Sequence, residues 1–207
     1  MIDYEFYETP HTFSHWLFDE VPMSGRIFEP CVGSGAIVEA RYPPNGVRWF
    51  TNDLDPRWPA DVHKDATDRT LWEAHEFDWT VTNPPFSPAI DILTHAIHYS
   101  RVGVAMHLRA SIHEVLKTGA RRTWMHDHPP TGILWLPRFG YQRSKTTGEW
   151  STDSVCACWC IWLKDPFAPQ FIRYAPEWVL DELAKETPHY RARMDRLMAT
   201  YQERVGV

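Results

Sequence analysis

The chain has 207 residues, of which 43% are hydrophobic and 23% are charged, and its net charge is −6. This length suits one folded unit with a hydrophobic core. The first residues are acidic, and no stretch approaches the roughly 18 apolar residues of a membrane span, which predicts a cytoplasmic protein without a membrane partner. The four cysteines have neither disulfide-framework nor zinc-site spacing, so no metal site is expected.

Strands and helices alternate along most of the chain. Strands are predicted where short apolar runs end at a polar residue or a glycine, over residues 26–29, 47–51, 62–64, 77–82, 102–108, 131–136 and 155–163. Helices are predicted after Thr9-Pro10, over residues 36–40 and 67–76, and after Ser87-Pro88. Residues 111–114 have the spacing of a capping box. The tail predicts two further helices, separated by Pro188.

Repeated strand-helix units predict an α/β fold, with a mostly parallel seven-stranded sheet and helices on both faces. A polar loop over residues 138–154 leaves no room for a clear helix, so the last of the seven strands is expected to be antiparallel. Residues 1–165 are expected to form the main domain, to which residues 101–154 contribute basic segments. Residues 166–207 are expected to be a helical extension packed on that domain.

The charge is distributed unevenly along the sequence. The net charge is −10 over residues 1–100, +5 over residues 101–150 and −1 over residues 151–207. A polyanion such as DNA could be held by phosphate contacts to the basic middle segment while the acidic half faces away. The candidate DNA-binding residues are Arg109, Lys117, Arg121, Arg122, Arg138, Arg143 and Lys145.

Polar residues and glycines follow the early strands. In an open parallel sheet, ligands bind beyond the carboxyl ends of the strands. The residues expected at this edge are Glu29, Gly33, Gly35, Asp53, Asp65 and Asn83. The glycine loop has Val38 where a dinucleotide fingerprint has its third glycine, and the chain lacks a Gly-Lys-Ser/Thr motif. A carboxylate after the second strand suits ribose hydroxyls, and acidic neighbours tolerate a cationic nucleoside without phosphate, such as S-adenosylmethionine.

The tetrapeptide Asn83-Pro84-Pro85-Phe86 follows the fourth predicted strand. Each proline fixes φ and removes an N–H group, so nearby carbonyl groups point outward without a local donor. A planar amino group would meet the Asn83 side-chain oxygen, the Pro84 carbonyl and the face of Phe86. The motif therefore predicts a site that holds an exocyclic amine.

The motifs Glu8-Thr9-Pro10, Phe28-Glu29-Pro30-Cys31-Val32-Gly33-Ser34-Gly35, Asn52-Asp53-Leu54-Asp55-Pro56, Asp65 and Asn83-Pro84-Pro85-Phe86 together resemble those of the Rossmann-like class I methyltransferases that act on adenine N6 in DNA. Their order is that of the gamma class, and the later part resembles small methyltransferases of bacteriophages and prophages. The resemblance covers residues 7–100 by motif and residues 101–165 more loosely.

The resemblance implies that S-adenosylmethionine is the cofactor. Thr9 and Pro10 would lie near its methionine part, and Glu29, Gly33 and Gly35 would line its loop. Asp53 would bind the ribose, Asp65 the adenine, and Asn83 would reach both the cofactor and the target. Asn83, Pro84 and Phe86 would form the catalytic motif, acting on a base flipped out of the duplex.

Several alternatives stay open at the level of sequence. Asn-Pro-Pro-Phe also occurs in methyltransferases for RNA bases and for protein glutamine, and cytosine N4 is a further acceptor. A catalytically silent protein that binds cofactor or DNA is another interpretation. Single residues have structural alternatives: Thr9 and Asp65 as helix caps, Glu29 as a strand-end carboxylate, and the glycines as turn residues. The target sequence, a role in restriction-modification, and a monomer or weak dimer are not determined by the motifs.

Overall fold

The computed structural model describes residues 7–40, 46–113, 120–143, 147–151 and 156–205, with backbone only for residues 113, 120–123 and 201–205. Its strands are β1 (Gly25–Glu29), β2 (Val47–Thr51), β3 (Phe77–Thr82), β4 (Ser100–Arg109), β5 (Gly132–Trp135), β6 (Ala157–Leu163) and β7 (Phe171–Tyr174). Its α-helices are α1 (His11–Glu20), α2 (Arg69–Glu73), α3 (Ala89–Tyr99), α4 (Ala120–Asp127) and α5 (Glu177–Val205).

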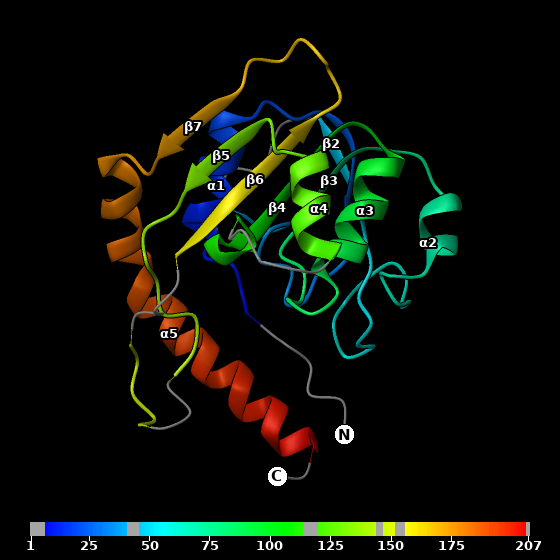
Figure 1. The fold of residues 1–207 in the computed structure, drawn as a ribbon. Coiled ribbons are helices and arrows are strands. Elements are labelled where there is room, and N and C mark those ends of the chain that lie inside the picture. The colour runs from blue at the N-terminus through cyan, green and yellow to red at the C-terminus, as the bar shows by residue number, and fades with distance from the viewer. Residues whose placement is uncertain (1–6, 41–45, 114–119, 144–146, 152–155, 206–207) are drawn as a thin grey trace.

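The strands form one seven-stranded sheet in the order β2-β1-β3-β4-β6-β5-β7 (Figure 1). The four strands β2, β1, β3 and β4 are parallel to one another. β6 lies between β4 and β5 and is antiparallel to both, whereas β7 is parallel to β5. The antiparallel strand is therefore the one predicted over residues 155–163, and the expected α/β fold is confirmed.

Side chains of the sheet alternate between two buried layers, because successive residues of a strand point to opposite faces. On β6, Trp159 and Ile161 pack with α1 and α5, whereas Cys158, Cys160 and Trp162 pack with α2, α3 and α4. In Figure 1, α3 and α4 lie in front of the sheet and α1 lies behind it. The sheet is thus covered on both faces, as the strand-helix alternation predicts.

Several predicted elements differ from the structure. The strand expected over residues 62–64 is a single bridge from Val62 to Asn52, and the seventh strand of the sheet is instead β7, within the extension that was expected to be helical. The helix expected over residues 36–40 is a series of turns, which follows Gly35 with its non-helical φ of +85°. The capping box of residues 111–114 extends to Glu114, which lies outside the described residues.

The two helices predicted in the tail are one helix, α5, with Pro188 inside it. Proline removes a hydrogen bond and usually ends a helix. The buried side chains Val179, Leu183, Tyr190 and Met194 all pack in the layer that holds α1, on both sides of Pro188. Packing along this shared face outweighs the local cost of the proline.

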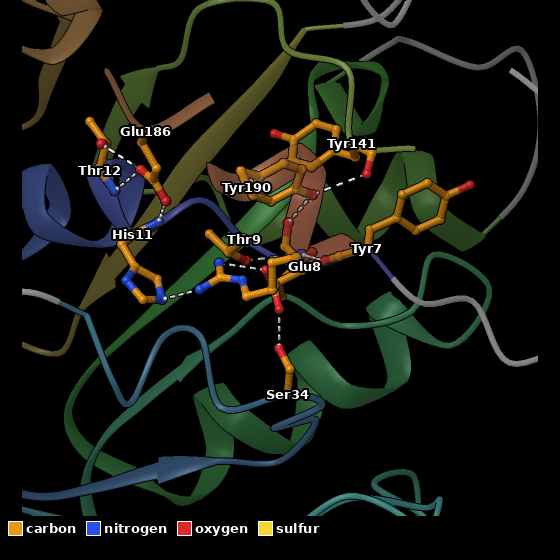
Figure 2. A network of polar contacts seen from close by, with 11 residues as sticks. Tyr7, Glu8, Thr9, His11, Thr12, Ser34, Tyr141, Glu186 and Tyr190 are labelled. Carbon is orange, nitrogen blue, oxygen red and sulfur yellow. Dashed lines mark hydrogen bonds and ion pairs between the residues drawn. The ribbon is translucent and has the colours of Figure 1, made fainter. Parts of the chain in front are cut away.

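The N-terminus of α1 also differs from its prediction. Its N-cap is Pro10, and no side chain of the segment caps it. Glu186 of α5 does so instead, because its carboxylate accepts hydrogen bonds from the backbone N–H groups of His11 and Thr12 at 2.8 and 2.9 Å (Figure 2). Thr9 is thereby free of the capping role that its sequence position suggests.

No helix among the described residues has the length and apolar character needed to cross a bilayer. Within the same residues, no three His, Cys, Asp or Glu side chains come together as a metal site would require.

Candidate active site

A cavity of about 150 Å³ opens at the carboxyl ends of β1, β2 and β3, beside the segment that leads into α1. The residues predicted at the edge of the sheet are brought together here by chain topology. Its lining contains five of the eight predicted cofactor-binding residues: Thr9, Gly33, Asp53, Asp65 and Asn83.

The glycine loop is held in place by Asp53. Gly33 has a φ of +50°, a conformation that glycine adopts without strain. Its N–H donates to Asp53 Oδ2 at 2.8 Å, and the N–H of Asp55 donates to Asp53 Oδ1 at 2.9 Å. Burial raises the pKa of Asp53, while these two hydrogen bonds act in the opposite direction. Asp53 therefore fixes the loop and presents a partly buried carboxyl group to the cavity.

Glu29, Gly35 and Pro10 are not among the residues that line the cavity. Glu29 is 1% exposed and lies beneath the loop, where its Oε1 accepts the N–H of Cys31 at 3.1 Å. Burial raises the pKa of Glu29 to about 8, so the group is largely protonated at neutral pH. Its position is that of a support for the loop. Gly35, with a φ of +85°, serves the turn, and Pro10 occupies the N-cap position of α1.

The outer side of the cavity is formed by exposed residues. Asp65 is exposed, and its Oδ1 accepts hydrogen bonds from the N–H and hydroxyl of Thr67 at 2.8 and 2.7 Å. The side chain that caps α2 is Asp68, so Asp65 is not a helix cap. Leu54, which is 48% exposed, and Trp58 add apolar surface beside it.

Asn83 is held at the end of β3 by contacts to other parts of the chain. Its Nδ2 donates to the carbonyl oxygen of Tyr7 at 2.7 Å and to Thr9 Oγ1 at 3.1 Å. Its Oδ1 lies 3.3 Å from Nδ1 of His107, on β4. The carboxamide therefore joins β3, β4 and the N-terminal segment at one point.

A second, smaller cavity of about 10 Å³ adjoins the first. It is lined by Tyr7, Asn83, Phe86, His107, Arg109, Tyr141 and Ala157. Tyr7 and Asn83 line both cavities. The Arg109 guanidinium lies over the Phe86 ring, 4.1 Å from its centroid. The face of Phe86 predicted to stack a base is thus covered by a planar cation.

The remaining predicted residues are distributed as follows. Pro84 is buried and is not among the residues that line either cavity. Arg138 is exposed. Lys117 and Lys145 lie outside the described residues, and Arg121 and Arg122 fall on α4 where only the backbone is described.

Arg143 is engaged by α5 rather than free to meet a phosphate. Its Nε and Nη2 donate to the carboxylate of Asp195, both at 2.8 Å, and its Nη1 donates to the carbonyl of Gly148. The hydrogen bond to Asp195 raises the pKa of Arg143 and lowers that of the carboxyl group. This pair joins the loop after β5 to the C-terminal helix.

Sequence reasoning missed Glu8 and His107 as site residues. Glu8 is 3% exposed and lines the larger cavity, where Ser34 donates to its Oε2 at 2.5 Å and Arg193 of α5 pairs with its Oε1 at 2.5 Å (Figure 2). The only sequence signal for Glu8 as a site residue was its position directly before Thr9-Pro10. His107 was detectable as one polar residue within the apolar run of β4.

The larger cavity has an acidic lining. Glu8, Asp53, Asp55 and Asp65 line it, and none of the described residues that line it is Lys or Arg. Asp55 is neutralised by Arg57, which lowers the pKa of Asp55 through its hydrogen bonds. Glu8 is likewise paired with Arg193, so Asp53 and Asp65 are the carboxyl groups that would repel a phosphate and suit hydroxyl groups or a cation.

No protein-family model matches the sequence, and no curated protein matches it significantly. Solved structures do match the fold. The type I restriction-modification methyltransferase subunit of Streptococcus thermophilus aligns with a TM-score of 0.56 at 13% identity, over 89% of this chain and 53% of that chain. A protein described as an RNA methyltransferase from Pyrococcus horikoshii aligns with a TM-score of 0.54 at 15% identity, over 77% and 88% of the two chains.

A protein described as an O-methyltransferase from Agrobacterium tumefaciens aligns with a TM-score of 0.53 at 14% identity, over 80% of this chain and 86% of that one. The chain spans about half the length of the type I subunits that it matches. The chain therefore has the Rossmann-like fold of class I methyltransferases, a fold that does not by itself define the reaction.

Proposed function

We propose that this protein is a methyltransferase that uses S-adenosylmethionine to methylate the N6 amine of adenine in DNA. One observation carries the proposal: Asn83 lies on the wall between the larger cavity and the smaller one that holds Phe86. A group in this place can contact a methyl donor on one side and an acceptor amine on the other. The fold of the neighbours and the Asn-Pro-Pro-Phe motif support the same assignment.

The larger cavity fits the cofactor by its chemistry. Asp53, Leu54, Trp58 and Asp65 line it, and in this proposal Asp53 binds the ribose hydroxyls while the other three hold the adenine ring and its amino group. Thr9 and Glu8 also line this cavity, and Glu8 accepts a hydrogen bond from Ser34 of the glycine loop. Without a lysine or arginine in its described lining, the cavity disfavours a phosphate-bearing nucleotide and suits a cationic nucleoside.

When bound there, S-adenosylmethionine supplies a sulfonium methyl group, and the residues of the chain orient the acceptor. Asn83 Oδ1 accepts a hydrogen bond from the adenine amine. The second acceptor expected from the motif is the Pro84 carbonyl, although Pro84 is buried and lines neither cavity before a base enters. The two hydrogen bonds draw the amino hydrogens out of the plane of the adenine ring. This raises the electron density on the nitrogen and directs its lone pair toward the sulfonium methyl group. This is an effect of positioning and electrostatics, not of a strong base.

The acceptor base must displace Arg109. A cavity of about 10 Å³ is roughly the size that one water needs, far too small for a purine. Movement of the Arg109 guanidinium from the Phe86 ring would expose the stacking face and place a cation near the phosphate of a flipped nucleotide. Arg109 thus takes a DNA-binding role in the proposal, together with exposed Arg138.

The test measures transfer of a labelled methyl group from S-adenosylmethionine to unmethylated DNA, followed by identification of the methylated base. The wild type is expected to yield N6-methyladenine. Asn83→Ala is expected to lose about 10²-fold or more in rate, by analogy with a lost oxyanion-hole donor, while it still binds cofactor in calorimetry. Asp91→Asn, an exposed change on α3, is the matched control and should behave as the wild type.

The same assay separates the alternatives. If the label is found in N4-methylcytosine, in RNA or in a protein, the protein is still a methyltransferase, but its acceptor is not the N6 amine of adenine. Cofactor binding without label in any acceptor would favour a catalytically silent binding protein. Full activity of Asn83→Ala would overturn the assignment of the site.

A further inference from the structure

The hydrogen-bond partners of the Asn83 carboxamide determine its orientation. The Tyr7 carbonyl can only accept a hydrogen bond, and it lies 2.7 Å from the amide end that also approaches Thr9 Oγ1. That end must therefore be the nitrogen. The oxygen is left facing His107 Nδ1 at 3.3 Å.

The partners of the two ring nitrogens determine the tautomer of His107. The ring is 4% exposed, lies parallel to Phe13 with centroids 6.3 Å apart and meets the edge of Trp159. Burial lowers the pKa of His107 to about 3, so the neutral ring carries one N–H at physiological pH. Because Asn83 Oδ1 can only accept, that N–H is on Nδ1. Nε2 is then an acceptor, and the hydroxyl of Tyr141 lies 3.0 Å from it.

Tyr141 is itself held in place from the C-terminal helix. Its side chain is 6% exposed, and its carbonyl oxygen lies 3.0 Å from the hydroxyl of Tyr190 on α5. The same hydroxyl lies 2.9 Å from the carbonyl of Glu8, next to Tyr7 and Thr9 (Figure 2). Both ends of the carboxamide are thus tied, through different residues, to one side chain of α5.

We propose that Tyr141 and His107 form a positioning relay that holds the Asn83 carboxamide oxygen toward the acceptor amine. The inference rests on the proposed function, because it deepens the role of Asn83. Tyr141 donates to His107 Nε2, His107 Nδ1–H donates to Asn83 Oδ1, and the remaining lone pair of that oxygen is available to the amine. His107 moves no proton in the reaction and is a positioning residue, not a catalytic one.

The first experiment compares His107→Asn with His107→Gln. The asparagine amide nitrogen can take the place of Nδ1 and restore the donor to Asn83, whereas glutamine reaches the place of Nε2. The relay predicts that His107→Asn keeps kcat within about tenfold of the wild type, while His107→Gln and His107→Phe lose about 10²-fold, the scale of a small misplacement at a site. The KM for DNA and the affinity for cofactor are expected to change by about twofold or less in all three.

A role in packing alone predicts the opposite order, because asparagine is smaller than glutamine and leaves the larger void in a buried site. If His107→Asn is no more active than His107→Gln, the relay is refuted.

A second experiment does not depend on activity. In protein labelled with ¹⁵N-histidine, NMR should show a protonated Nδ1 and an unprotonated Nε2 for His107. Tyr141→Phe should shift the side-chain amide signals of Asn83, whereas Tyr174→Phe, at a site that is 75% exposed on β7, should leave them unchanged. The Nε2–H tautomer, or an unchanged Asn83 signal in Tyr141→Phe, would overturn the relay.

The two readouts separate the proposals. If the wild type methylates nothing while the NMR results are as expected, the proposed function fails and the relay stands as a feature of the structure. If methylation occurs and the tautomer is wrong, the relay fails alone.

Discussion

The candidate active site has an inner wall and an outer rim that are built differently. The inner wall consists of Thr9, Asn83 and His107, which are buried or partly buried and bonded to distant parts of the chain, and it is supported by Glu29, buried beneath the glycine loop. The outer rim consists of Asp53, Asp65, Arg109 and Arg138, all at least partly exposed. The inner wall is arranged before any ligand arrives, whereas the rim offers charges that a ligand can use.

This difference predicts that changes in the inner wall act on stability and turnover, and that changes in the rim act on binding. Four further experiments, in order of decreasing expected effect, can break or sharpen that division.

The largest effect is expected from pH acting on Glu29. Its pKa is raised to about 8 in the folded chain, from a usual value of 4.5. The folded state therefore holds a proton that the unfolded state releases between these values, and the resulting stability is fully present below about pH 4.5 and lost as pH rises through about 8. Within this window the free energy of unfolding should fall by about 1.4 kcal/mol per pH unit.

Glu29→Gln keeps the acceptor for Cys31 N–H and removes the titration. Urea unfolding at several pH values between 5 and 8 should give a flatter profile for this variant than for the wild type. Parallel profiles would show that Glu29 is not the buried acid that the structure indicates.

The second experiment tests the inner wall through turnover. Thr9→Val keeps the shape of the side chain and removes an acceptor for Asn83 Nδ2, so kcat should fall about tenfold from loosened positioning. The affinity for cofactor should change by about threefold or less. Thr94→Val, at an exposed position on α3, is the matched control. If Thr9→Val lowers the affinity for cofactor and leaves kcat unchanged, Thr9 acts in binding, as the residues of the outer rim are expected to do.

The third experiment tests the rim through cofactor binding. Asp53→Asn removes a charge and leaves only one acceptor for two backbone N–H groups, so calorimetry should show affinity for S-adenosylmethionine lowered about tenfold. At saturating cofactor, kcat should stay within about twofold. Asp61→Asn, whose carboxylate binds Thr51 at an exposed site on the same edge, should have little effect. A large fall in saturated kcat would contradict the division.

The smallest effect is expected from the cations of the rim. Arg109→Gln should weaken DNA binding several-fold and reduce the slope of log affinity against log salt by about one, the signature of one lost phosphate contact. Arg143→Gln removes the same charge from a side chain that is bound to Asp195, so its slope should match that of the wild type. If the two variants have equal slopes of log affinity against log salt, Arg109 does not contact a DNA phosphate. Fluorescence anisotropy over a range of salt concentrations measures both.

The sequence predicted the sheet because its signals were local. Apolar runs such as residues 77–82 and 155–163 identify strands without reference to the rest of the chain. The same logic placed Asn83 and Asp53 at one edge. Local signals gave the wrong result where tertiary packing determines the structure. Pro188 predicts the end of a helix, yet α5 continues through it because both halves of α5 bury side chains against the same layer.

The inner wall was predicted only in part, because its partners are far apart in the sequence. Thr9 has a strong local signal as a helix cap, and its contact with Asn83 spans 74 positions. His107 and Tyr141 lie 34 positions apart and have no common motif. Tertiary contacts of this kind leave little trace in one sequence beyond a polar residue inside an apolar strand.

The contacts of α5 have a consequence for the order in which the molecule matures. Tyr190, Glu186 and Arg193 brace the segment that contains Glu8 and Thr12, more than 170 positions earlier in the chain. A ribosome makes residues 7–12 before it makes these three side chains, which lie more than 170 positions later in the chain. The nascent domain can therefore complete its sheet before its candidate active site, and the cofactor binding that we propose should emerge only after residue 193 has left the exit tunnel.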